Sequence, residues 1–136
     1  MKLDKDIYQE LIKNIDIRQV NLKNLSVESS NKIEQENIKI SVSHDVIKYE
    51  REKDKFSVLT EFEVQGLIEE QKVFNIYFIL ELSYSLEASI TFEEQYIDFF
   101  TKNNVPVNAW PYARELVSNL TLRMGLSALI LPVLRV

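Results

Sequence analysis

The sequence is poor in the residues on which most enzymes and metalloproteins depend: its 136 residues include no cysteine, one histidine and two glycines. Without cysteine, neither a disulfide nor a thiolate-ligated metal site can form. His44 alone cannot supply a catalytic triad or a histidine metal site, and we interpret it as a surface residue at the end of a strand. Two glycines are too few for a loop whose backbone wraps a phosphate. We therefore expect a protein that is not an enzyme and that needs no cofactor and no metal.

Positive charge and long apolar runs are also scarce. The chain has 21 acidic and 16 basic residues, a net charge of −5, which argues against a nucleic-acid-binding protein, because such proteins concentrate positive charge. No apolar stretch approaches the ~20 residues that span a membrane. The opening residues, MKLDKDIYQE, lack the apolar core of an export signal. These features predict a cytoplasmic protein that binds no nucleic acid and does not insert into a membrane.

What the sequence does have is an ordinary globular composition, 46% hydrophobic and 27% charged. Its length predicts a single domain over residues 1–136. Alternating apolar residues indicate four strands. The first strand changes phase at Lys23 and Asn24, which predicts a bulge, and the charged stretch 48–55 is expected to be a solvated loop. The predicted strands cover residues 17–28, 38–42, 56–65 and 73–86, with a hairpin turn at residues 69–71.

Two short helices are expected beside these strands. Residues 4–15 carry apolar side chains at helical spacing after Asp4, a favourable N-cap, and we expect this helix to pack back on the domain rather than serve a partner. A second helix begins at a capping box formed by Thr91 and Glu94. It is rich in aromatic residues and ends at residues 103–104.

The main helix is expected between an N-cap at Asn108 and Gly125, the residue that can leave a helix through the left-handed region. Pro111 is placed in its first turn, where a missing N–H costs nothing. Residues 105–107 precede it as an extended link. The predicted fold class is α+β: a four-stranded antiparallel sheet with the long C-terminal helix and a shorter helix packed on one face, plus a short N-terminal helix.

The chain has more apolar surface than one sheet and one helix can bury. The last strand is apolar on both of its faces, and the aromatic helix and the link add further apolar residues. Two interpretations stay open: these residues fill the core and an oligomer interface, or they form a groove for non-native polypeptide. Each client anchor would contribute roughly 1.5–3 kcal/mol on burial.

Three segments near the C-terminus carry a family resemblance. Residues 110–115 read Trp-Pro-Tyr-Ala-Arg-Glu, Gly125-Leu126 follows at the end of the helix, and residues 131–133 read Leu-Pro-Val. This series resembles the signature of SecB-type export chaperones, in which an aromatic-Pro-Tyr-Ala-Arg-Glu segment opens the main helix. Residues 20–28, VNLKNLSVE, are similar to the first strand of that family. The resemblance covers roughly residues 17–134.

The resemblance implies an ATP-independent chaperone that keeps unfolded preproteins competent for export or folding. SecB-like proteins are homotetramers, built as dimers of dimers, whose main helices lie between two sheets and whose long apolar grooves hold the client. By this resemblance the client-binding residues are Tyr77, Ile79, Phe99, Phe100, Val105, Val107 and Trp110. The helix–helix contacts of the oligomer fall on Leu116, Leu120 and Met124.

Delivery to SecA, the translocase motor, is a separate expectation. The acidic docking positions of the family fall at Asn24, Glu28, Asn75 and Tyr77, of which only Glu28 is acidic here, and the sequence lacks the helix and tail that follow the Pro-Val segment in the family. A chaperone dedicated to one partner, such as the antitoxin of a toxin–antitoxin system, is therefore an alternative. A structural or small-ligand-binding oligomer of the same fold, without chaperone activity, is another.

Overall fold

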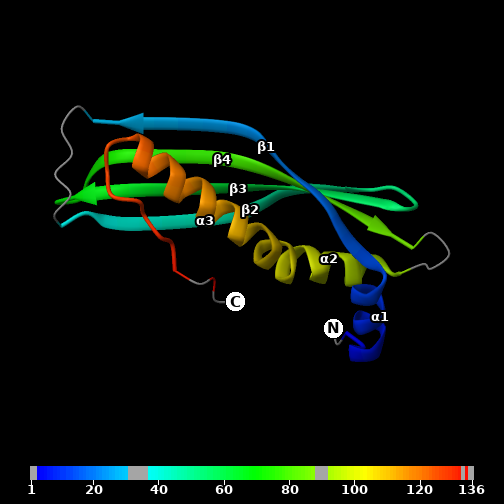
Figure 1. Ribbon diagram of the computed structural model, residues 1–136. Coiled ribbons are helices and arrows are strands. Elements are labelled where there is room, and N and C mark those ends of the chain that lie inside the picture. The colour runs from blue at the N-terminus through cyan, green and yellow to red at the C-terminus, as the bar shows by residue number, and fades with distance from the viewer. Residues whose placement is uncertain (1–2, 31–36, 88–91, 133, 135–136) are drawn as a thin grey trace.

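The computed structural model describes residues 3–30, 37–87, 92–132 and 134 (Figure 1). Within these residues the predicted α+β class is confirmed: three helices accompany one antiparallel sheet of four strands. None of the described helices is long and apolar enough to cross a membrane. The elements are α1 (Lys5–Lys13), β1 (Ile15–Ser29), β2 (Lys39–Arg51), β3 (Lys55–Ile68), β4 (Gln71–Leu86), α2 (Glu94–Asn103) and α3 (Val105–Arg123).

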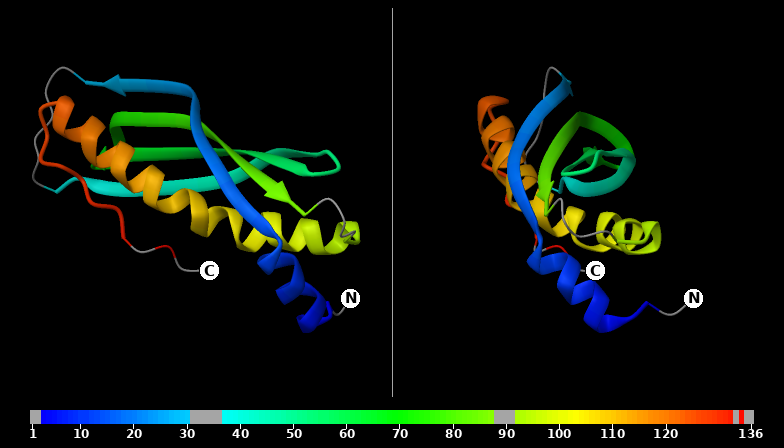
Figure 2. Two further views of the ribbon diagram at one scale, coloured as in Figure 1. Left: turned by 45° about the vertical axis from the view of Figure 1, so that its right-hand side comes forward. Right: turned by 90° about the vertical axis from the view of Figure 1, so that its right-hand side faces the viewer.

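The sheet has the strand order β1-β4-β3-β2, which places β3 and β4 at its centre. Along both central strands every second side chain is buried, as period-two alternation predicts for a sheet with one covered face. The covered face carries α2, α3 and residues 126–132 (Figure 2). Its aromatic rings pack across the strands, and Phe62 stacks on Phe78 with ring centroids 5.0 Å apart.

Strand β1 contains two bulges. One is the predicted irregularity between Leu22 and Asn24, and the second, between Ile17 and Gln19, was not expected. Each bulge inserts one residue and so resets the alternation of side chains. As a result all six apolar residues of β1 pair with buried residues of β4 and lie on the helical face of the sheet. These residues are Ile15, Ile17, Val20, Leu22, Leu25 and Val27.

Strand β2 is longer than the sequence pattern indicated, and the solvated loop expected at residues 48–55 was largely wrong. The strand continues to Arg51, and the turn is confined to residues 52–54, where Glu52 N–H donates to the Lys55 carbonyl at 2.8 Å. A bulge between Val46 and Lys48 shifts the register. Because that shift breaks the alternation of the sequence, the second half of the strand was not recognised.

Helix α3 begins at Val105, three residues before the expected N-cap, so residues 105–107 are helical and not an extended link. Pro106 occupies the first turn, and Pro111 lies inside the helix. Proline at position 111 removes the hydrogen bond to the Val107 carbonyl, and Val107 is 47% exposed. Helices α2 and α3 follow each other directly as one long bent rod (Figure 1).

The two helix ends that the sequence marked most clearly are confirmed. Asp4 caps α1, its carboxylate accepting from Asp6 N–H at 2.9 Å. Gly125 has φ +85°, and the hydrogen bonds Gly125 N–H to Leu122 and Leu126 N–H to Thr121 close α3 in a Schellman motif. Helix α2 has Glu93 at its N-cap position, without a side-chain cap bond; the predicted cap Thr91 lies outside the described residues.

Helix α1 folds back on the domain, as expected, and its side chains contact α2. Leu11 is fully buried, and the ring of Tyr8 meets that of Phe99 edge to face at 4.8 Å. The Tyr8 hydroxyl donates to the side chain of Asn104, and Asp4 N–H donates to the Tyr96 hydroxyl at 3.1 Å.

The β3–β4 hairpin gives a first prediction. Glu69 and Glu70 form its two-residue turn with φ of +52° and +66°, a geometry that favours Asn-Gly and costs other residues ~1 kcal/mol each. The double substitution E69N/E70G should therefore raise the free energy of unfolding by about 1 kcal/mol and Tm by about 3 °C. The variant E69Q/E70Q removes the same charges but keeps the backbone strain, so thermal unfolding should show no comparable gain.

Tyr84 gives a second prediction. Burial raises the pKa of Tyr84 from 10.0 to about 12, an effect only partly offset by the hydrogen bond that it accepts from Asn108 Nδ2 at 2.9 Å. Above pH 10 the unfolded chain loses this proton while the native state keeps it, so stability falls as pH rises from 10 towards 12. Thermal unfolding of Y84F should show a shallower loss over that range. The matched control is Y112F, at a tyrosine that is 47% exposed, and it should keep the wild-type slope.

Candidate polypeptide-binding surface

The largest group of exposed apolar side chains on the sheet lies along β1. Ile17, Leu22, Leu25 and Val27 are 38–47% exposed, although they share the helical face with the core. We call these four residues the β1 strip. Helix α3 lies over β3 and β4 (Figure 1) and does not cover them. Side chains that face the core side of a sheet and stay exposed are typical of a surface that another polypeptide covers.

The junction of α2 and α3 divides the residues that the sequence assigned to a client. Phe99 and Val107 are exposed there, whereas Phe100 and Val105 are buried. The Phe100 ring packs edge to face on Tyr84 at 5.3 Å, which fixes it as part of the core. Of these four predicted client contacts, Phe99 and Val107 are exposed, and their contact with a client stays a prediction.

Tyr77 and Ile79 lie on the opposite face of the sheet from the helices. They therefore cannot line one groove together with residues of α2 and α3. The neighbours of Tyr77 are acidic: it pairs with Glu63, and its hydroxyl donates to Glu61 Oε2 at 2.8 Å. That hydrogen bond raises the pKa of Tyr77, with smaller effects of desolvation and of the nearby carboxylates.

The positions predicted to dock a translocase gather on this outer face. Glu28 pairs with Asn75, and Asn24 pairs with Ile79, next to Tyr77. The register of β3 and β4 adds three carboxylates to this face, one of which, that of Glu81, lies 3.7 Å from Lys23 Nζ. These are Glu61, Glu63 and Glu81. The outer face is consequently more acidic than Glu28 alone indicated.

On the helical face, a trough runs between β2 and the helices. Its open part is a cavity of about 460 Å³ lined by residues of β2, α2 and the first turn of α3, among them His44, Ile47, Thr101 and Pro106. His44 is exposed, as expected, but lies in the middle of β2 rather than at its end. Its ring lies 6.0 Å from that of Trp110.

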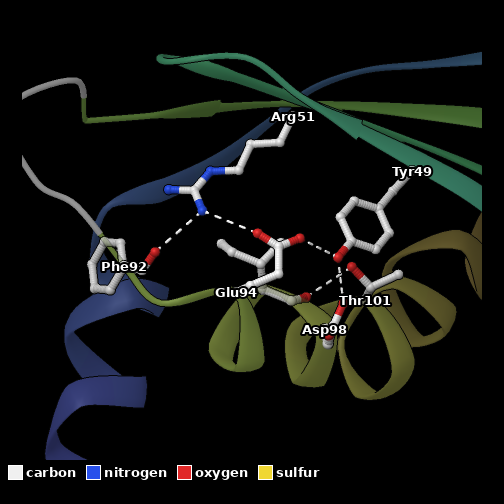
Figure 3. Close-up of polar contacts among 7 residues, drawn as sticks. Tyr49, Arg51, Phe92, Glu94, Asp98 and Thr101 are labelled. Carbon is white, nitrogen blue, oxygen red and sulfur yellow. Dashed lines mark hydrogen bonds and ion pairs between the residues drawn. The ribbon is translucent and has the colours of Figure 1, made fainter.

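A polar network closes one end of this trough and joins β2 to α2 (Figure 3). The Tyr49 hydroxyl contacts the carboxylates of Glu94 and Asp98, and burial together with these two contacts raises the pKa of Tyr49. Arg51 Nη1 lies 3.6 Å from Glu94 Oε2 and donates to the Phe92 carbonyl at 3.2 Å. The network positions the edge strand against the helix. Among the described residues no cluster of His, Asp and Glu could hold a metal ion.

The other part of the trough is filled by residues 126–132, which we call the C-terminal strap. After Gly125 the strap turns back along α3 (Figure 1). Trp110, predicted to face a client, is buried beneath it, and the indole Nε1–H donates to the Pro132 carbonyl at 2.7 Å. A second cavity, of about 210 Å³, lies between the strap and the sheet; its lining includes Ile38, Ile40 and Phe74.

The residues assigned to the oligomer interface lie on α3. Leu116, Leu120 and Met124 are half-buried and pack against the edge of the core. Their spacing of four residues places them on one side of the helix, where part of each side chain is open to solvent. Their contact with a second copy of the chain stays a prediction.

Comparisons with known proteins agree with this geometry. The family model described as preprotein translocase subunit SecB matches residues 8–134. The SecB-like chaperone Rv1957 of Mycobacterium tuberculosis, solved in complex with a ChAD peptide from the antitoxin HigA1 (Rv1956), has a TM-score of 0.82 at 18% identity, covering 96% of this chain and 98% of that one. A Streptococcus agalactiae protein of unknown function has a TM-score of 0.50 at 10% identity, covering 87% and 96%. Among curated proteins, none matches the sequence.

Proposed function

Because the chain belongs to the SecB preprotein translocase subunit family, we propose that it is a cytoplasmic, ATP-independent chaperone that holds non-native polypeptides in apolar grooves. Chaperones of this family are not enzymes. Residues 1–136 would form one SecB-like domain. The client would be kept competent for export or for folding, without cofactor or metal.

The open apolar surface of the helical face carries this proposal. The β1 strip is exposed although it faces the core side of the sheet, and Phe99 and Val107 are exposed at the α2–α3 junction. Each apolar anchor that a client buries at these residues contributes roughly 1.5–3 kcal/mol. Association costs at least ~4 kcal/mol, so a single short groove binds weakly. Several grooves joined in one oligomer would hold an unfolded chain by avidity. We therefore propose a homotetramer, a dimer of dimers, with Leu116, Leu120 and Met124 in its helix–helix contacts.

A chaperone dedicated to one partner is the second candidate. It is favoured by the likeness to Rv1957, whose structure contains a peptide of an antitoxin. Both versions use the same groove and differ only in the range of clients. For delivery, the acidic outer face around Glu28, Glu61 and Glu63 supports docking to a basic surface, such as one on a SecA-type motor.

The general chaperone predicts suppression of aggregation by exposed residues of the α2–α3 junction. The variants F99S and V107S should weaken the suppression, each by about threefold or more in the protein concentration required, because each removes one apolar anchor. Light scattering of chemically unfolded citrate synthase diluted into buffer measures this. The matched control is I12S on α1: Ile12 is 41% exposed, close to the 40% of Phe99 and 47% of Val107. It should act as wild type does.

The outcome also separates the candidates. Suppression with several unrelated unfolded clients supports the general chaperone, and suppression confined to one cognate partner supports the dedicated one. A protein that is monomeric by light scattering and leaves every unfolded client to aggregate would refute both. Such a protein would be a structural or ligand-binding relative of the family.

A further inference from the structure

The C-terminal strap is bound to α3 through its main chain, a mode of binding that a peptide from another protein could also use. Two side chains of α3 bond its main chain: Thr121 Oγ1 accepts from Leu129 N–H at 2.9 Å, and Trp110 Nε1–H donates to the Pro132 carbonyl at 2.7 Å. Thr121 in turn donates its hydroxyl proton to the Val117 carbonyl at 2.9 Å, which leaves its oxygen free to accept. Bonds to main-chain groups do not depend on the side chains of the bound segment. This seat therefore selects an extended backbone and not a particular sequence.

The side chains of the strap are anchored at alternate positions. Leu131 is 1% exposed and Leu129 is half-buried, whereas Ile130 between them is 73% exposed. That is the period-two pattern of an extended peptide lying on an apolar surface. Beneath Leu129, the strap leaves the cavity of about 210 Å³ beside Ile40 and Phe74 unfilled. A segment with a larger apolar side chain at this position would fill the seat better than the strap does.

The seat also continues past the strap. Next to Trp110, the ring of His44 borders the open cavity of about 460 Å³, whose lining combines the apolar side chains of Val46, Ile47 and Pro106 with polar and charged ones such as Asp98 and Lys102. The seat of the strap and the open cavity are thus neighbouring parts of the trough along β2, linked through Trp110 and His44. An extended polypeptide longer than the strap could occupy both parts, gaining contacts that the strap does not make.

We propose that the seat of the strap is a client subsite, that the strap occupies it in the unliganded protein, and that an extended apolar segment of the client displaces the strap. This inference rests on the proposed chaperone function and names one of its binding sites. The occupant is a polypeptide with aliphatic or aromatic side chains at two alternate positions. Its observed affinity is reduced by the fraction of molecules in which the strap is seated.

The test uses a fluorescein-labelled synthetic peptide of residues 126–134, LSALILPVL, extended by two lysines for solubility. L131D replaces the buried anchor of the strap and should bind this peptide at least about tenfold more tightly than wild type, since the seat is then free. I130D places the same charge on the neighbouring exposed side chain and should bind within about twofold of wild type. Fluorescence anisotropy measures both. Emission of Trp110, the single tryptophan, should shift to the red in L131D alone.

Cross-linking the strap to the sheet should have the opposite effect to L131D, because the strap can then no longer leave its seat. In the variant I40C/A128C, both new thiols line the 210 Å³ cavity, and a bis-maleimide can bridge them in a chain that has no other cysteine. Because Ile40 lines the seat itself, the control is the same variant with its two thiols capped separately by N-ethylmaleimide. The bridged protein should bind the peptide at least about tenfold more weakly than the capped protein, whose strap can still leave the seat. Equal binding by the bridged and the capped protein would overturn the inference, as would a folded L131D that binds no better than wild type. If L131D does not fold, peptide binding by the bridged protein tests the inference on its own.

The two proposals fail separately. If wild type suppresses aggregation of citrate synthase but strap variants leave peptide binding unchanged, the subsite is wrong and the chaperone function stands. If wild type suppresses no aggregation of any client, the proposed function itself is refuted.

Discussion

One helix is too narrow to cover a sheet of four strands, and this mismatch determines how the surfaces of the protein are used. Neighbouring strands lie ~4.8 Å apart, so four of them span roughly 15–20 Å, whereas an α-helix with its side chains is about 10 Å across. Helix α3 lies over the central strands β3 and β4, which leaves a flank on each side of it. The β2 flank is filled in part by the C-terminal strap, and on the β1 flank the apolar side chains of the strip stay exposed.

The bulges of β1 increase the apolar surface that the helix leaves uncovered. In a regular strand, the residues between Ile17 and Val27 would divide between the two faces. Two bulges instead place every apolar side chain of the strand on the helical face, next to the core and beyond the reach of α3. A strand of this kind gives the monomer little burial, since four of its six apolar residues are 38–47% exposed. Its apolar face gains burial only when another polypeptide covers it.

The fold class was predictable because helix ends and strands with alternating apolar residues depend on residues that are close together in the sequence. Asp4 and Gly125 act through their own backbone neighbours, and both were assigned correctly. The helix start was predicted wrongly because the local sequence allows two positions for it. Both Pro106 and Pro111 could stand in a first turn, and only the packing of Val105 in the core places the helix start at the earlier one.

The candidate site was less predictable, because its residues come together through register and burial. The sequence shows that Tyr77 and Ile79 are apolar, but not that they share the outer face with Glu61 and Glu63, since that depends on the pairing of β3 with β4. Likewise, Phe100 and Trp110 have the composition of a binding surface and are buried. Composition identified the surplus of apolar residues, and three-dimensional packing decided which of them stay exposed.

The separation of the two faces bears on how holding and delivery could combine. The apolar flanks of the helical face lie on one side of a single layer of strands, and the carboxylates of Glu28, Glu61 and Glu63 lie on the other. A client in the trough and a basic partner on the outer face would therefore not compete for the same atoms. Apolar burial depends little on salt, whereas attraction between exposed charges is screened within about 10 Å at 0.1 M salt. Added salt should thus weaken the outer-face contact and leave the client bound, because the two faces rely on different forces.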